Sequence, residues 1–161
     1  MGANRLDGKV CAAKVESSLS SRIRDLTERV SSPHLAVVIV GDDPASHVYV
    51  RSKERACERL GIRSTRIDLP AAASFDKVLA TVESLNQDPD VDGILVQSPL
   101  PRGMDELAIT DHILPEKDVD GFHPVNLGRL VQGRLDGLLP CTPAGVMYLL
   151  KFAELDLTGL K

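Results

Sequence analysis

The stretch Leu35-Ala-Val-Val-Ile-Val40, closed by Gly41, decides the fold. A short, uninterrupted and largely β-branched run predicts a strand buried on both faces, as the central strands of parallel sheets are. Asp43 then supplies a helix N-cap directly before a proline, and Gly61 supplies a stop signal. Residues 44–60 are therefore expected to form a helix, and strand, turn and helix together make one βα unit of a parallel sheet.

The alternation of strands and helices continues on both sides of this unit. By apolar spacing and capping residues, further strands are expected over residues 62–69 and 91–97, and helices over residues 9–30, 75–85, 105–113, 125–131 and 142–153. This order predicts an α/β fold, a three-layer sandwich with a mainly parallel sheet. Ligands of such sheets bind beyond the carboxyl ends of the strands, which here directs attention to residues 41–46 and 97–101.

Composition argues against several classes of partner. The chain has 161 residues, 19 Lys and Arg against 23 Asp and Glu, and only three Phe, two Tyr and no Trp. A net charge of −4 with so few aromatic rings leaves neither a basic face nor stacking platforms, so no nucleic-acid partner is expected. The longest apolar run falls far short of the ~20 residues that span a bilayer, so no membrane partner is expected either.

The N-terminus and the cysteines bear on the compartment. Residues 1–6 have no apolar core of a signal peptide, so a cytoplasmic protein is expected. Cys11, Cys57 and Cys141 are odd in number and widely spaced, which argues against a disulfide framework or a zinc site.

Three polar residues fall near the expected carboxyl ends of the strands. Tyr49 and Lys53 are one helical turn apart, so their side chains share one helix face. A lysine acts as a base when burial or a neighbouring cation destabilises its ammonium form; a solvated helix face is the simpler alternative, because charged residues surround the pair. Gln97 ends an apolar strand, where its amide can donate and accept hydrogen bonds or can have no functional role.

The segment Asp118-Val-Asp120-Gly121 carries two carboxylates two residues apart. The pattern suits a divalent metal, a base, or the capture of two adjacent N–H donors on a heterocycle. An Asx turn before the glycine is the simpler alternative. No metal site is expected, because His112 and His123 have no partner at ligand spacing. No dinucleotide site is expected either, because the glycines form no phosphate-binding loop.

Four stretches occur in a family-specific order and spacing: Val40–Lys53, Gly93–Pro101, Pro115–Leu130 and Pro140–Gly145. With them, the chain from Leu6 to Lys161 closely resembles the bifunctional methylenetetrahydrofolate dehydrogenase/methenyltetrahydrofolate cyclohydrolase family. One departure is Ser98, where the family usually has Leu.

The resemblance implies two reactions of one-carbon folate metabolism. 5,10-Methylenetetrahydrofolate is oxidised to 5,10-methenyltetrahydrofolate with NADP or NAD, and the product is hydrolysed to 10-formyltetrahydrofolate. Lys53 would be the base for water attack, and Gln97 would orient it. Tyr49 would stack on the folate, and Asp120 would bind the pterin N–H donors. The further substrate-binding residues that the resemblance implies are Val50, Val96, Ser98 and Leu100.

The resemblance also implies a division of the chain. Residues 1–150 would form the catalytic, folate-binding domain, and residues 151–161 would begin the connection to a Rossmann-like NAD(P)-binding domain that this sequence does not contain. The missing domain would bind most of the cofactor, and the full-length enzyme would be a homodimer. Two alternatives stay open: a folate-binding module without turnover, and a short-chain dehydrogenase, which shares the Tyr-x-x-x-Lys spacing but needs a glycine-rich loop after its first strand.

Overall fold

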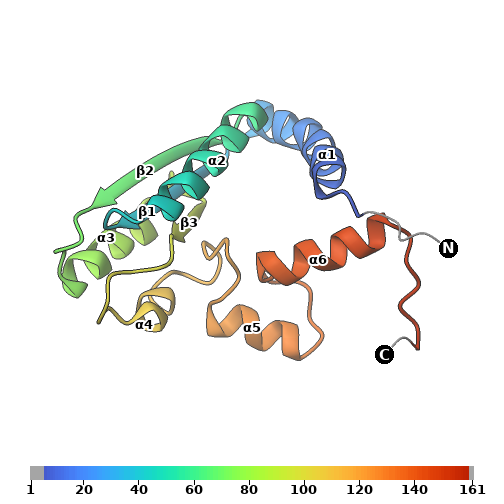
Figure 1. Ribbon diagram of the computed structural model, residues 1–161. Helices are drawn as coiled ribbons and strands as arrows, with labels where there is room; N and C mark the ends of the chain where they lie inside the picture. Colours follow the sequence, from blue (N-terminus) through green and yellow to red (C-terminus); the bar gives the residue numbers. More distant parts are fainter. Residues whose placement is uncertain (1–5, 160–161) are drawn as a thin grey trace.

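Strand β1 (His34–Val40) is the middle strand of a three-stranded parallel sheet with the order β2–β1–β3. The computed structural model describes residues 6–159, with β2 spanning Arg63–Leu69 and β3 spanning Gly93–Val96 (Figure 1). Residues 36–40 of β1 are all buried, so the prediction of a doubly buried central strand is confirmed.

Helices cover both faces of the sheet. Helix α2 (Pro44–Leu60) packs on one face, where Val50 joins Val37, Ile39 and Leu95 in a small buried cluster. Helices α3 (Phe75–Gln87) and α4 (Glu106–Thr110) lie on the other face, which holds the larger cluster. That cluster includes Ala36, Val38, Val78, Val82, Ile94 and Ile109. The predicted three-layer α/β arrangement is confirmed.

Local signals set the bounds of α2. The Asp43 carboxylate accepts a hydrogen bond of 2.7 Å from the backbone N–H of Ser46, and Gly61 ends the helix with φ of 74°. The helix predicted over residues 44–60 from Asp43 and Gly61 is therefore confirmed. The helix expected over residues 105–113 is shorter, because the buried Asn86 binds the His112 carbonyl and the Leu114 N–H and turns the chain away from helical geometry.

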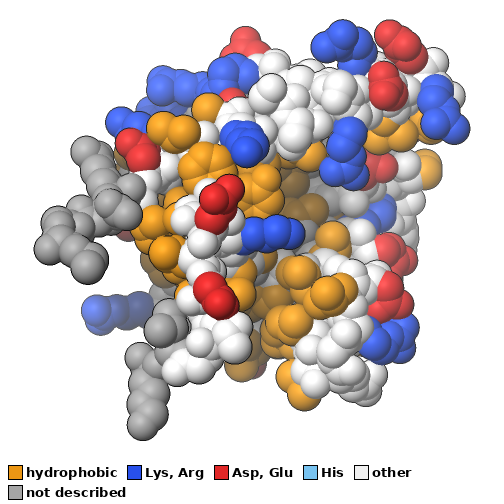
Figure 2. All heavy atoms as spheres, turned by 90° about the vertical axis from the view of Figure 1, so that its right-hand side faces the viewer, with side chains coloured by type: hydrophobic (Ala, Val, Ile, Leu, Met, Phe, Trp, Pro, Cys, Tyr) orange, Lys and Arg blue, Asp and Glu red, His pale blue; other side chains and the backbone are white. Residues whose placement is uncertain are grey.

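Three helices lie outside the two layers that cover the sheet: α1 (Gly8–Arg29), α5 (Pro124–Val131) and α6 (Cys141–Phe152). Helix α6 contacts α1, buries none of its residues and exposes Val146, Met147 and Tyr148. Figure 2 looks at the side of the molecule where α1 and α6 lie and shows hydrophobic side chains gathered on it. Among the described residues, no helix combines the length and the apolar character needed to cross a membrane.

Two expectations fall partly outside the described residues. The N-terminal segment was expected to lack a signal peptide, and its residues 1–5 are not described. The expected connection over residues 151–161 includes residues 160 and 161, which lie outside the described range as well.

Candidate functional site

A lysine and a glutamine from two different elements meet beside the sheet. Lys53 lies on α2, Gln97 directly follows β3, and the Lys53 Nζ donates a hydrogen bond of 3.1 Å to the Gln97 Oε1. The Gln97 Nε2 donates to the Ser98 carbonyl at 2.6 Å. Because the Gln97 Nε2 is hydrogen-bonded to this carbonyl, the amide oxygen is the atom that faces Lys53. The sequence analysis expected these two residues to lie together, and the structure brings them together.

The loop between α4 and α5 carries the two aspartates, which have different surroundings. The Asp118 side chain is 1% exposed and accepts hydrogen bonds from the backbone N–H groups of Gly121 at 3.1 Å and His123 at 2.8 Å. It also accepts one from the Asn126 Nδ2 at 3.0 Å. The Asp118 carboxylate therefore holds the backbone of its own turn, through N–H groups three and five residues on rather than the two of an Asx turn. Asn126, on α5, was missed, since nothing in its local sequence pattern marks it.

Asp120 faces a different environment. Its side chain is half-buried, and burial raises the pKa of its carboxyl above the ordinary value of 3.8, an effect that the charge of Lys53 opposes and that of Asp118 reinforces. No hydrogen bond among the described residues lowers the pKa of Asp120. Its oxygens therefore remain available as acceptors for a ligand, which Asp118's oxygens are not.

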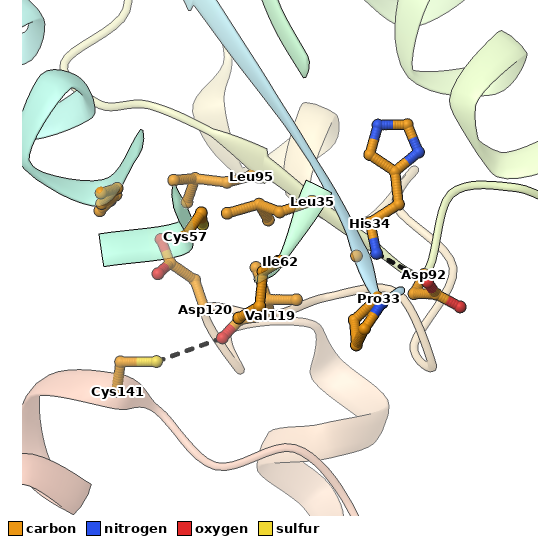
Figure 3. A pocket seen from close by; sticks show the side chains of 12 residues that line it. Pro33, His34, Leu35, Cys57, Ile62, Asp92, Leu95, Val119, Asp120 and Cys141 are labelled. Atoms are coloured by element: carbon orange, nitrogen blue, oxygen red, sulfur yellow. Dashed lines mark hydrogen bonds between the residues drawn. The ribbon is translucent and has the colours of Figure 1, made fainter. Parts of the chain in front are cut away.

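Lys53 and Asp120 line one cavity of about 380 Å³ (Figure 3). Leu35, Leu95, Val119 and Ile62 form apolar walls, and His34 and Asp92 lie at the end away from Asp120. Two of its strand-derived lining residues, Leu35 and Leu95, belong to the α2 side of the sheet. The cavity extends along this face of the sheet, and the expectation that a ligand binds beyond the carboxyl ends of the strands stays a prediction.

Two cysteines also line this cavity. Cys57 lies one helical turn after Lys53, and Cys141 begins α6 and donates from its Sγ to the Val119 carbonyl at 3.2 Å (Figure 3). Burial raises the pKa of both thiols, so both are protonated near neutral pH. The sequence analysis did not include them in the site, although the four-residue spacing from Lys53 places Cys57 on the same helix face.

Other expected site residues lie elsewhere. Tyr49 is 64% exposed on α2 and does not line the cavity. Val50 is fully buried in the core under α2, and its expected role in binding the substrate stays a prediction. Val96 and Leu100 pack with the cluster on the α3 side. For Val96 this follows because side chains of a strand alternate between faces and the preceding Leu95 faces α2. Ser98 is exposed, and its hydroxyl donates to Glu106.

The N-terminus of α2 is capped from within the chain. In the first βα turn the Asp43 carboxylate occupies the N-terminus of α2, the place where a phosphate would need free N–H groups. Within residues 6–159, no three His, Cys, Asp or Glu side chains gather closely enough to hold a metal ion.

A lysine and a carboxylate line one cavity beside a parallel sheet, and an amide holds the lysine; this arrangement is typical of the active sites of α/β enzymes. The family is shown by the sequence itself. Residues 6–120 match the tetrahydrofolate dehydrogenase/cyclohydrolase catalytic domain, and the chain belongs to that family. The match decides against the short-chain dehydrogenase alternative.

Individual relatives agree with this assignment. The chain is 50% identical over 159 residues to the bifunctional protein FolD of Halalkalibacterium halodurans and 54% identical over 154 residues to that of Methanospirillum hungatei. These alignments cover 99% and 96% of the chain but 57% and 54% of the two relatives. The chain thus spans little more than half the length of the relatives it matches.

Solved structures give the same result. The FolD methylenetetrahydrofolate dehydrogenase/cyclohydrolase of Campylobacter jejuni superposes with a TM-score of 0.93 at 47% identity, over 96% of this chain and 55% of that one. The Trypanosoma brucei enzyme, described as a complex with NADP cofactor and inhibitor, has a TM-score of 0.93 at 33% identity, over 99% of this chain and 55% of its own.

Proposed function

We propose that this chain supplies the folate site and the catalytic residues for two reactions. These are the NADP-dependent oxidation of 5,10-methylenetetrahydrofolate to 5,10-methenyltetrahydrofolate and the hydrolysis of the product to 10-formyltetrahydrofolate. The observation that carries the proposal is the Lys53 Nζ, held 3.1 Å from the Gln97 Oε1 in a cavity that Asp120 also lines. The names of the related enzymes support it.

Asp120 and the apolar walls would bind the pterin. The carboxylate has two oxygens that can accept hydrogen bonds from two neighbouring N–H donors, and burial makes each such bond stronger than in water. The flat apolar walls from Leu35, Leu95 and Val119 suit a fused ring system. Tyr49, exposed one turn before Lys53, would stack on the part of the substrate that leaves the cavity.

Lys53 would then manage the protons of the hydrolysis. Gln97 accepts one Nζ hydrogen and so directs the rest of the amine. The positive charge of the methenyl substrate favours the neutral amine, because two like charges at close range repel each other. The neutral amine takes a proton from water while the water oxygen bonds to the cationic carbon. The lysine ammonium then returns this proton to one of the two nitrogens as its C–N bond to the carbon breaks. The second proton of the water leaves the oxygen as the formyl C=O forms, so the overall reaction releases one proton.

The oxidation needs a hydride acceptor that the described residues do not hold. NADP, or NAD, would accept the hydride from the methylene carbon when bound to a partner domain. The proposal therefore includes a catalytic domain over residues 1–150, a connection that begins at residues 151–161, and a homodimeric full-length enzyme. The proposal also places the enzyme in the cytoplasm. There it would act in one-carbon metabolism, which supplies purine, methionine and histidine biosynthesis.

Replacement of Lys53 by Met tests the proposal, because Met keeps the length of the side chain and removes the amine. Hydrolysis of methenyltetrahydrofolate is followed by absorbance, and binding of a folate analogue by calorimetry. We expect a loss of hydrolysis on the order of 100-fold, as for removal of a positioned base. Arg55→Met, an exposed position on the same helix, is the matched control.

The outcomes separate the proposed enzyme from its rival. Hydrolysis that is close to normal in Lys53→Met contradicts the role of the lysine. A wild-type chain that binds the folate analogue and shows no hydrolysis, whether alone or joined to an NADP-binding domain, supports the folate-binding module without turnover.

A further inference from the structure

The loop after Gln97 is held at two points by one carboxylate. Glu106, the first residue of α4, accepts a hydrogen bond of 2.9 Å from the Ser98 hydroxyl and one of 2.8 Å from the Leu100 backbone N–H. A carboxylate that uses both oxygens in this way restrains the segment between its two donors. Glu106 is itself well anchored, because Ile109 in the same short helix is 1% exposed within the larger core cluster.

The restrained segment contains the carbonyl that orients Gln97. The Ser98 carbonyl accepts from the Gln97 Nε2 at 2.6 Å, and the buried Ser46 hydroxyl lies 3.4 Å from the same oxygen. An amide can rotate by half a turn at little steric cost, because its oxygen and nitrogen are nearly the same size. Turned round, Gln97 would present N–H donors to the Lys53 ammonium, which has no acceptor, and the hydrogen bond of 3.1 Å would be lost.

We propose that Glu106 is a positioning residue for Lys53, acting through Ser98 and Gln97. By holding Ser98 in place, Glu106 keeps a carbonyl in front of the Gln97 Nε2, and the Gln97 Oε1 is thereby kept toward the lysine. The hydroxyl of Ser98, the residue that departs from the family pattern, gives this chain the second of the two bonds to Glu106. For its effect on catalysis the inference rests on the function proposed above, but the orientation of Gln97 can be measured without any activity.

The first measurement follows the Gln97 side-chain amide by ¹H–¹⁵N correlation spectroscopy of the labelled chain. Gln97→Glu, which has no side-chain NH₂, identifies the signal pair by its disappearance. In Glu106→Ala we expect this pair to move toward the position of a solvent-exposed amide. In Glu106→Gln it should stay, because the new amide accepts from the Leu100 N–H and donates to the Ser98 hydroxyl oxygen.

The matched control is Asp105→Ala, which removes the N-cap hydrogen bond of 3.1 Å to Ala108 from the same helix without touching the loop. If Glu106 acted only by stabilising α4, this variant would move the Gln97 signals as far as Glu106→Ala does. Should Glu106→Ala fail to fold, Ser98→Ala removes one of the two bonds and is expected to give a smaller shift in the same direction.

The second measurement is the steady-state hydrolysis of methenyltetrahydrofolate. Loss of the Gln97 orientation should lower kcat about tenfold, the factor that corresponds to one net hydrogen bond. KM should change by less than about twofold, because Asp120 and the apolar walls are untouched. Unmoved Gln97 signals in Glu106→Ala, or an equal effect of Asp105→Ala, would overturn the inference.

The two measurements keep the inference apart from the proposed function. Gln97 signals that move in a chain without hydrolysis support the positioning role and count against the function. Gln97 signals that move while kcat stays normal leave the function standing and overturn the claim that Glu106 acts on Lys53.

Discussion

Asp118→Asn should destabilise the fold, because it changes the buried carboxylate that organises the turn 118–123. One oxygen of Asp118 accepts from the His123 N–H and the Asn126 Nδ2, and the other accepts from the Gly121 N–H. Asparagine keeps the shape but has one oxygen, which will face the two donors. Its NH₂ group then faces the Gly121 N–H, so that two donors meet in a site that is 1% exposed.

The cost of this conflict is that of one buried donor without an acceptor, about 1–3 kcal/mol. For a domain of this size each kcal/mol lowers Tm by roughly 2–4 °C. We therefore expect Asp118→Asn to lower Tm by roughly 2–12 °C in thermal unfolding followed by circular dichroism.

Asp120→Asn provides the contrast. Burial raises the pKa of Asp120, so its charge is unfavourable in the folded state, and removing that charge should leave Tm unchanged or higher. Binding of a folate analogue should weaken by about 1–3 kcal/mol, because one of the two acceptors for the pterin is lost. Unfolding that is normal in Asp118→Asn, together with a lower Tm in Asp120→Asn, would show that the roles of the two aspartates are reversed.

Three further predictions concern this loop and the strand residue that packs against it. Burial raises the folded-state pKa of Asp120 above 3.8, so the contribution of its protonated form to stability is fully present below pH 3.8 and is lost as pH rises through the folded-state pKa. In urea unfolding, the free energy of unfolding of Asp120→Asn should therefore increase relative to that of the wild type as the pH rises through this range. Gly121→Ala should lower the free energy of unfolding by at least about 2 kcal/mol in the same assay, because φ is 73° and the new methyl would collide with the Leu139 backbone. Gly93→Ala should instead weaken folate-analogue binding in calorimetry with a smaller loss of Tm, because its methyl would press on the movable side chain of Val119 beside Asp120.

The parts of the fold that could be predicted are those with local signals. Asp43 and Gly61 mark the two ends of α2 through a side-chain cap and a left-handed backbone, and both effects depend on residues within one turn. The pair Tyr49 and Lys53 follows from helical spacing. The bond between Lys53 and Gln97 spans 44 residues, so only the resemblance to a known family could suggest it.

The features that the sequence pattern could not supply depend on contacts distant in sequence. A continuous apolar strand such as Gly93–Val96 carries no alternation, so its pattern cannot tell which face Val96 uses. Asn126 and Glu106 look like ordinary surface residues of short helices. Their partners, Asp118 and Ser98, become evident only when the loops after β3 are folded over the sheet.

Each candidate catalytic group is supported by a different neighbour, and that separation explains why stability and function can be tested independently. Lys53 stands on a helix that Val50 and Cys57 anchor in the core, three residues before it and four after. Asp120 is two residues from the buried Asp118, whose three accepted hydrogen bonds offset the cost of burying its carboxylate. Gln97 takes its orientation from a loop tied to α4. Both oxygens of Asp118 accept hydrogen bonds, whereas the half-buried carboxyl of Asp120 accepts none that lowers its pKa among the described residues. The charge of Asp120 is unfavourable in the folded chain without a ligand, and the proposed pterin N–H donors would stabilise it. We therefore expect Asp118→Asn to lower Tm, and Asp120→Asn to leave Tm unchanged or raise it while it weakens ligand binding.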